Sequence, residues 1–134
     1  MTFEVSILAW SVLLTVVQFA LMAAALKRDV GPRWMGGSRD ELRQFGPMAG
    51  RMKRAFDNQL EGLLLFAAAV VVVTLSGHST AFTQWMATFY LAARIAYVPA
   101  YAFPVWGLRS AVWSVGFFAT VAMVVSALVF ATPL

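Results

Sequence analysis

The sequence contains no cysteine and a single histidine, and charged residues make up only 12% of its 134 residues. The absence of cysteine excludes disulfides, thiolate metal sites and a cysteine nucleophile, so any thiol chemistry must act on a thiol that arrives with a substrate. The one histidine, His78, lies in a Ser-Gly-His-Ser segment that is typical of a solvated turn. One histidine without cysteine does not supply the ligands of a protein metal centre, and we therefore predict no metal site.

Apolar residues are correspondingly abundant. Hydrophobic residues make up 61% of the chain, and its mean hydropathy is +0.77. This composition is too apolar for a soluble domain of this size and indicates an integral membrane protein. We predict an all-α fold, a single domain over residues 1–134, whose four helices each have about the 20 residues needed to cross the hydrocarbon layer. The predicted helices cover residues 3–26, 48–76, 82–103 and 108–131.

Basic residues are distributed unevenly along the chain. Eight of the ten lie between the first apolar run and the start of the second: Lys27, Arg28, Arg33, Arg39, Arg43, Arg51, Lys53 and Arg54. The second connection, residues 77–81, carries none. By the positive-inside rule, the loop 27–47 is therefore cytoplasmic and both termini face outward. The pI of about 10.1 then reflects this topology and contact with anionic membrane lipids. Nothing in the pattern indicates a nucleic-acid groove.

Polar residues recur at helical spacing where the second span begins. Arg51, Arg54, Asn58 and Glu61 follow one another in steps of three, four and three, which places all four on one face of a helix. The apolar run that enters the bilayer comes immediately afterwards. Ionisable groups at membrane depth are energetically costly, and they indicate a functional site by default.

Two further polar groups are predicted at the same, cytoplasmic end of the protein. Arg94, Tyr97 and Tyr101 share one face of the third span, and Arg109 and Ser110 open the fourth. Together with the second helix, these residues offer arginines for carboxylates, a carboxylate and an amide for an ammonium group, and a hydroxyl beside a guanidinium. The set complements a zwitterionic, peptide-like ligand with several carboxylates.

Each of these residues also has a purely structural interpretation. Glu61 could neutralise Arg54 or Arg94 inside the bundle, and Asn58 could bridge two helices. The two tyrosines of the third span could belong to the belt of aromatic residues at the membrane interface. The sequence alone leaves both interpretations open.

A different functional class would also use Glu61. In a small proton-coupled exporter, an intramembrane acid alternates between a protonated and a substrate-bound state. Such an acid is expected near the membrane midplane in an otherwise uncharged span. Glu61 lies instead near the cytoplasmic end of its helix, with Arg54 on the same face.

Two segments resemble a known family. The stretch from Arg51 to Glu61 (Arg-Met-Lys-Arg-Ala-Phe-Asp-Asn-Gln-Leu-Glu) resembles the Arg-Ala-x-x-Asn-x-x-Glu signature of the MAPEG family, the membrane-associated proteins in eicosanoid and glutathione metabolism. The stretch from Arg94 to Tyr101, followed by Arg109 and Ser110, resembles the third-helix and fourth-helix pattern of that family. The resemblance covers nearly the whole chain. It is to a bacterial-type member, which implies a multi-pass protein of the bacterial inner membrane.

The resemblance implies a homotrimer of four-helix subunits that binds glutathione as its cofactor in clefts between neighbouring subunits, on the cytoplasmic side. It implies a glutathione site made of Arg54, Asn58, Glu61, Arg94, Tyr97 and Tyr101. Arg109 would face the thiol and stabilise the thiolate, with Ser110 donating a hydrogen bond to the sulfur. The implied activity is that of a microsomal-type glutathione transferase or peroxidase acting on a lipophilic electrophile or hydroperoxide. A non-catalytic, lipid-binding member of the family is the alternative.

The sequence departs from the pattern of eicosanoid-metabolising members at three positions. Those members have an arginine where this chain has Asp57, and some have a histidine at the position of Tyr97 and a tyrosine at that of Trp113. An eicosanoid substrate is therefore not predicted.

Overall fold

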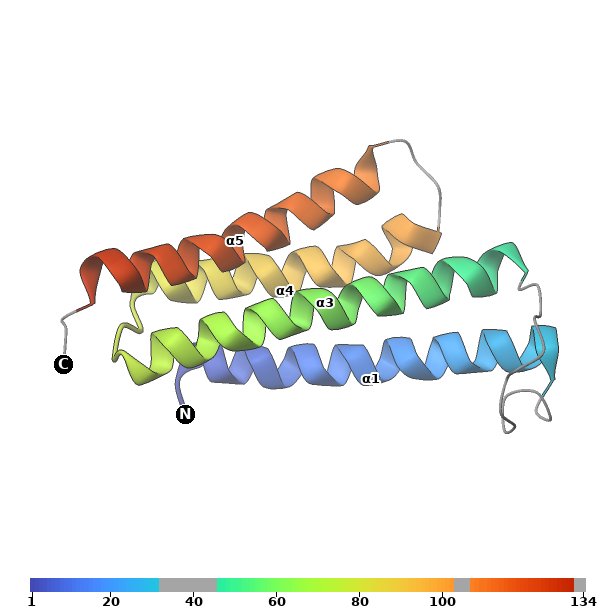
Figure 1. Cartoon of the computed structure of the whole chain (residues 1–134), viewed down its shortest axis with the longest axis horizontal. Coiled ribbons are helices and arrows are strands. Elements are labelled where there is room, and N and C mark those ends of the chain that lie inside the picture. The colour runs from blue at the N-terminus through green and yellow to red at the C-terminus, as the bar shows by residue number, and fades with distance from the viewer. Residues whose placement is uncertain (32–45, 103–106, 132–134) are drawn as a thin grey trace.

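The computed structural model describes residues 1–31, 46–102 and 107–131, without the side chains of 30 and 100–102. Within these ranges the chain forms four α-helices: α1 (Phe3–Val30), α3 (Pro47–Leu75), α4 (Ala81–Ala102) and α5 (Leu108–Phe130). The helices run side by side in an up-and-down bundle, and the all-α prediction is confirmed (Figure 1). α1 continues past its predicted end at residue 26, through Lys27 and Arg28, whose positive charges complement the helix dipole. Most of the predicted loop 27–47 lies outside the described residues.

The ends of α1 and of α3 are fixed by local hydrogen bonds. Thr2 caps α1 by accepting a hydrogen bond from the backbone N–H of Val5. Gly31 caps the C-terminal end of α1, and its positive φ of 85° suits glycine. The N–H of Gly46 donates to the Asp29 carboxylate over 2.7 Å, and Pro47 then opens α3. The start of α3 is thereby tied to the end of α1.

Among the described helices, α1, α3 and α5 are long and apolar enough to cross a membrane. α4 has 22 residues, including the polar Gln84 and Arg94, and is not one of these candidate spans. α3 and α5 run in the same direction in Figure 1, so the chain can enter α5 only after α4 has crossed back. The helices therefore belong to an integral membrane protein, as predicted, and α4 is the antiparallel helix that connects α3 to α5.

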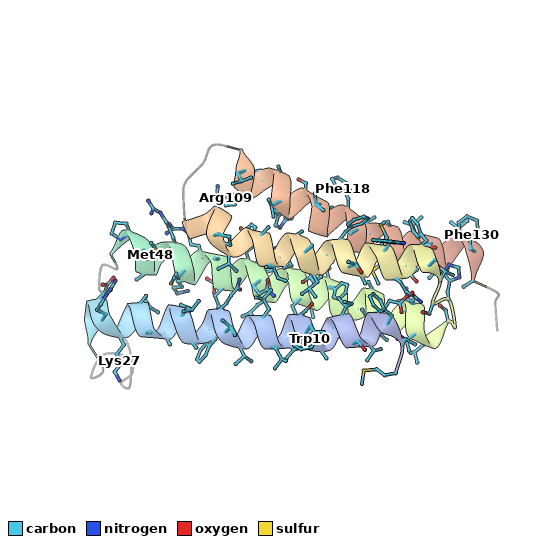
Figure 2. The ribbon with its side chains drawn as sticks, turned by 180° about the vertical axis from the view of Figure 1, so that it is seen from behind. Trp10, Lys27, Met48, Arg109, Phe118 and Phe130 are labelled. Atoms are coloured by element: carbon cyan, nitrogen blue, oxygen red, sulfur yellow. The ribbon has the colours of Figure 1, made fainter. Side chains whose placement is uncertain are left out.

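The bundle core is assembled from all four described helices. It consists of Ile7, Phe66, Ala69, Val70, Val73, Ala87, Tyr90, Met123 and Ala127. At its centre the rings of Phe66 and Tyr90 stack, with centroids 3.9 Å apart and planes inclined by 4°. Large apolar side chains such as Phe118 and Phe130 are exposed on the outer surface and project away from the bundle (Figure 2). In a membrane protein this outer surface faces lipid.

A buried carboxylate closes the end of the bundle at which α1 begins. Glu4 is 0% exposed and accepts hydrogen bonds from the hydroxyls of Ser79 (2.8 Å) and Thr83 (2.5 Å). His78, predicted as a solvated turn residue, is instead partly buried and shares a 2.9 Å hydrogen bond with the Ser126 hydroxyl. These contacts tie α1 and α5 to the turn between α3 and α4. At the opposite end α5 diverges from α3 and α4 (Figure 1).

Candidate functional site

A chain of buried hydrogen bonds crosses the bundle from α1 to α4. Gln59 of α3 is 0% exposed; its Nε2 donates to Thr15 Oγ1 over 2.9 Å, and its Oε1 accepts from Arg94 Nε over 2.8 Å. Arg94 is 2% exposed and also donates from Nη2 to Asn58 Oδ1 over 3.0 Å. Two neighbouring amides of α3 thus hold one guanidinium inside the bundle. These hydrogen bonds offset the cost of burying the polar groups.

The orientation of Arg94 leaves one nitrogen directed to the side of Gly62. Nε and Nη2 are held by α3, and Cζ lies 4.5 Å from the centroid of the Tyr97 ring, which is cation–π geometry. A Cβ atom built on Gly62 would lie 3.7 Å from Arg94 Nη1. Among the described residues, Nη1 has no hydrogen-bond partner. Arg94 is therefore fixed by two nitrogens and can offer the third to a ligand.

Two cavities adjoin this network between α3, α4 and α5. The Tyr90 cavity has a volume of about 90 Å³ and is lined by Glu61, Gly62, Leu65, Tyr90, Arg94, Trp113, Gly116, Phe117 and Thr120. The Arg109 cavity has a volume of about 180 Å³ and is lined by Asn58, Tyr97, Arg109, Ser110 and Trp113. Trp113 belongs to both linings, so the two cavities are neighbours. Both are lined by residues of the N-terminal half of α5, the half that diverges from the bundle (Figure 1).

Six of the eight residues predicted for the site line these two cavities: Asn58, Glu61, Arg94, Tyr97, Arg109 and Ser110. Arg54 is exposed and its Nη1 lies beside Gly50, one turn nearer the start of α3. Tyr101 belongs to α4, but its side chain lies outside the described residues. The structure thus brings together residues from three helices that are far apart in the sequence.

Of the two structural interpretations raised above, the ion pair of Glu61 is not found in the described residues, and the bridging role of Asn58 is. Within the described residues Glu61 forms no ion pair with Arg54 or Arg94, and it is exposed at the rim of the Tyr90 cavity. Asn58 does bridge helices, since its amide oxygen accepts a hydrogen bond from Arg94 of α4. Its amide nitrogen has no partner in the described ranges.

Sequence reasoning missed Gln59, Thr15 and Tyr90. Tyr90 precedes Arg94 by four residues, so extending the polar face of α4 by one turn would have identified it. Gln59 and Thr15 are polar residues within or next to apolar runs, and this is a signal for interhelical hydrogen bonding. Nothing in the sequence shows that Gln59 and Asn58, rather than Glu61, are the residues of α3 that bond Arg94.

The combined lining can bind an anionic or zwitterionic organic ligand. It offers guanidinium donors from Arg94 and Arg109, hydroxyls from Tyr90 and Ser110, and the Glu61 carboxylate as an acceptor. In the described part of the chain, no group of three or more His, Asp or Glu side chains is positioned to hold a metal ion.

A comparison with protein-family models matches residues 7–129 with the MAPEG family. The matched range includes every residue of the two cavity linings. No match was found among curated proteins or among solved structures.

Proposed function

Since the chain belongs to the MAPEG family, we propose that it is a glutathione-dependent membrane transferase or peroxidase that activates the glutathione thiol for attack on a lipophilic substrate. The convergence of Asn58, Tyr97, Arg109 and Ser110 on one cavity, beside the buried Arg94, is the observation that carries this proposal. A purely structural polar network would not need an arginine and a serine at the mouth of a cavity on a third helix.

Glutathione carries two carboxylates, one ammonium group and one thiol, and the lining supplies partners for one carboxylate, the ammonium group and the thiol. Arg94 Nη1 is available for a carboxylate, and the amide nitrogen of Asn58 can donate beside it. The Glu61 carboxylate, exposed at the cavity rim, can accept from the ammonium group. Charge-assisted hydrogen bonds of this kind are the strongest polar contacts that a protein can offer such a ligand.

Activation of the thiol is assigned to Arg109, with Ser110 donating a hydrogen bond to the sulfur. A free thiol has a pKa of about 8.5, so only a few per cent is thiolate at pH 7, and the thiolate is the nucleophile. A guanidinium about 4 to 6 Å from the sulfur lowers the pKa of the thiol by roughly 1 to 3 units. Arg109 lies in the first turn of α5, where the helix dipole adds to the positive potential. The released proton passes to solvent.

We place this site at the boundary between subunits of a homotrimer. Glu61, Arg109 and Ser110 are exposed on a single chain, and charged groups at membrane depth are normally covered by protein or face water. A neighbouring subunit would complete the cover, while the lipophilic substrate enters from the bilayer.

Thermal unfolding of the purified protein in detergent tests the proposal. Glutathione at roughly 100 times its Kd should stabilise the native protein by about 2.7 kcal/mol. S-methylglutathione should also bind but should give no thiolate absorbance, because its sulfur cannot ionise. An absence of stabilisation by either compound would contradict the proposal. Cation export that couples to protons through Glu61 would favour the exporter instead, and lipid binding without either activity would favour a non-catalytic protein.

A further inference from the structure

A groove lies along α5 at the opposite end of the bundle from the Arg109 cavity. Its volume of about 420 Å³ is larger than that of either cavity described above. It falls within the range of about 300–1,000 Å³ that is typical of small-molecule sites. The polar residues of its lining are His78, Thr80 and Ser126, and the apolar residues are Phe82, Ala122, Val125 and Phe130. We call it the His78 groove.

The imidazole of His78 supplies a hydrogen-bond donor to this groove. Nε2 lies 2.9 Å from Ser126 Oγ, and within the described residues the Ser126 hydroxyl has no other hydrogen-bond partner. The hydroxyl proton is therefore donated to Nε2. In a neutral imidazole one nitrogen accepts while the other carries the proton, so the proton of the ring lies on Nδ1. Nδ1 has no partner in the described part of the chain and can donate to an acceptor oxygen of a ligand.

The polar and apolar parts of the groove are arranged along the membrane-spanning direction. His78 follows the end of α3 at Leu75 and precedes the start of α4 at Ala81, so it lies where these helices end. The Phe130 ring lies 6.5 Å from the imidazole. From Phe130 the groove continues along α5 to Ala122, a distance of about 12 Å at about 1.5 Å per residue. Its apolar part thus extends into the bilayer, in the direction of lipid acyl chains.

The groove is continuous with the surface that contacts lipid. Phe82, Val125 and Phe130 are exposed, and Figure 2 shows Phe130 on the outside of the bundle. The lining, as far as the structure describes it, includes no Asp, Glu, Lys or Arg, so it offers no ion pair to a multiply charged ligand such as glutathione. A donor at the membrane boundary and an apolar channel below it complement an amphiphile that has an acceptor oxygen at that depth. Phospholipid ester carbonyls lie there, between the headgroup and the hydrocarbon core.

We propose that the His78 groove binds one membrane phospholipid. An ester carbonyl oxygen of the lipid accepts a hydrogen bond from His78 Nδ1, and an acyl chain lies against Val125 and Ala122. The bound lipid bridges α5 and the turn between α3 and α4, which the hydrogen bond between His78 and Ser126 already joins. This site is distinct from the Arg109 cavity, and the inference does not depend on glutathione binding.

Two phospholipids that differ only in their linkage test the carbonyl contact. The purified protein in dodecyl maltoside, which has no ester group, is titrated with dioleoylphosphatidylcholine or with its diether analogue, and native mass spectrometry gives the Kd of each lipid. The ester lipid should bind about 2- to 10-fold more tightly, as expected for one hydrogen bond. Equal Kd values would overturn the inference.

Two tryptophan variants on the exposed side of α5 test the position of the acyl chain. Val125→Trp fills the groove, whereas Val129→Trp adds the same ring one turn away, outside the lining. Val125→Trp should raise the Kd of both lipids at least about fivefold, and Val129→Trp should change it less than about twofold. Equal effects of the two variants would show general lipid contact and no defined site. A change in oligomer mass without a change in lipid affinity in Val125→Trp would identify the groove as a contact between copies of the chain, which also overturns the inference.

The single histidine gives a direct measurement on the unmodified protein. Selective ¹⁵N labelling of histidine reports on His78 alone. The signal of Nδ1 should be that of a protonated nitrogen, and it should shift when the ester lipid is added but not when the diether is added. His78→Phe retains an aromatic ring and removes both nitrogens, so it should abolish the preference for the ester lipid. An Nδ1 signal that responds identically to both lipids, or an ester preference that persists in His78→Phe, would contradict the assignment of His78.

Discussion

Replacing Gln59 with leucine should weaken glutathione binding without unfolding the protein. Gln59 does not line either cavity, yet its side chain is 0% exposed and holds Arg94 Nε over 2.8 Å. Leucine has a similar volume and removes both of the hydrogen bonds that Gln59 makes, to Arg94 and to Thr15. The guanidinium then keeps only its hydrogen bond to Asn58 and its contact with the Tyr97 ring.

The magnitudes of the two effects can be estimated separately. Hydrogen bonds between membrane helices contribute on average about 0.6 kcal/mol and at most about 1.7 kcal/mol, so losing two lowers the free energy of unfolding by roughly 1 to 3 kcal/mol. That is a minor part of a typical stability of about 5–15 kcal/mol. A guanidinium that no longer directs Nη1 into the cavity loses a charge-assisted hydrogen bond of about 1.5–3 kcal/mol, which raises the glutathione Kd roughly 10- to 150-fold.

Thr15→Val is the matched control, because it removes the hydrogen bond from Gln59 Nε2 and leaves the one to Arg94 intact. Thermal unfolding and calorimetric titration with glutathione should show a stability loss in both variants and an affinity loss only in Gln59→Leu. Gln59→Glu retains an acceptor for Arg94 Nε and should recover most of the affinity. Equal affinity losses in Thr15→Val and Gln59→Leu would refute the positioning argument.

Three further substitutions test other parts of the structure. Arg109→Ala should lower the transferase rate at least 100-fold while changing glutathione affinity only a few-fold. Titration of the bound thiolate by difference absorbance checks this. An unchanged thiolate pKa would show that Arg109 does not stabilise the thiolate. Glu61→Gln should weaken glutathione binding by about 1.5–3 kcal/mol, measured calorimetrically, and wild-type affinity would contradict the ammonium contact. Glu4→Ala removes the carboxylate that accepts from the hydroxyls of Ser79 and Thr83, although Thr83 can still donate to the carbonyl of Thr80. It should lower the unfolding free energy by about 1–3 kcal/mol in thermal melts, with glutathione affinity unchanged.

The helices could be predicted from the sequence because a helix that crosses a membrane must have a certain length and a high mean hydropathy. The same periodicity placed Arg94 and Tyr97 on one face of α4, and both line cavities in the structure. Periodicity gives a residue's face but not its partner. Asn58 and Glu61 are one helical turn apart, and only the packing of α3 against α4 decides that Asn58 contacts Arg94 and Glu61 does not.

Contacts between residues that are distant in the sequence could not be predicted either, because they also depend on how the helices pack. Glu4 and Thr83 are 79 positions apart and meet because α1 begins at the same end of the bundle as α4. Gly62 lies beside Arg94 and Tyr90 of another helix, and the sequence does not show this because glycine in an apolar span has many ordinary explanations. The departure of α5 from the bundle, which leaves room for both cavities, has no sequence signal that we can identify.

The two buried polar clusters differ in whether all of their hydrogen-bonding groups are paired, and this difference supports the placement of the proposed site at Arg94. At one end, the Glu4 carboxylate is surrounded by hydroxyl donors, and the cluster closes on itself. Near the middle of the bundle, the network around Gln59 fixes Arg94 but, among the described residues, leaves Nη1 and the Tyr90 hydroxyl without acceptors. Membrane burial makes unpaired donors costly. Gln18 and Thr74 are also buried without a partner in the described residues, but neither lines one of the two cavities. Burial alone therefore does not distinguish these two charges. The hydrogen bonds of Glu4 lie within the protein, which fits a structural role, whereas the remaining nitrogen of Arg94 supports the site that we propose.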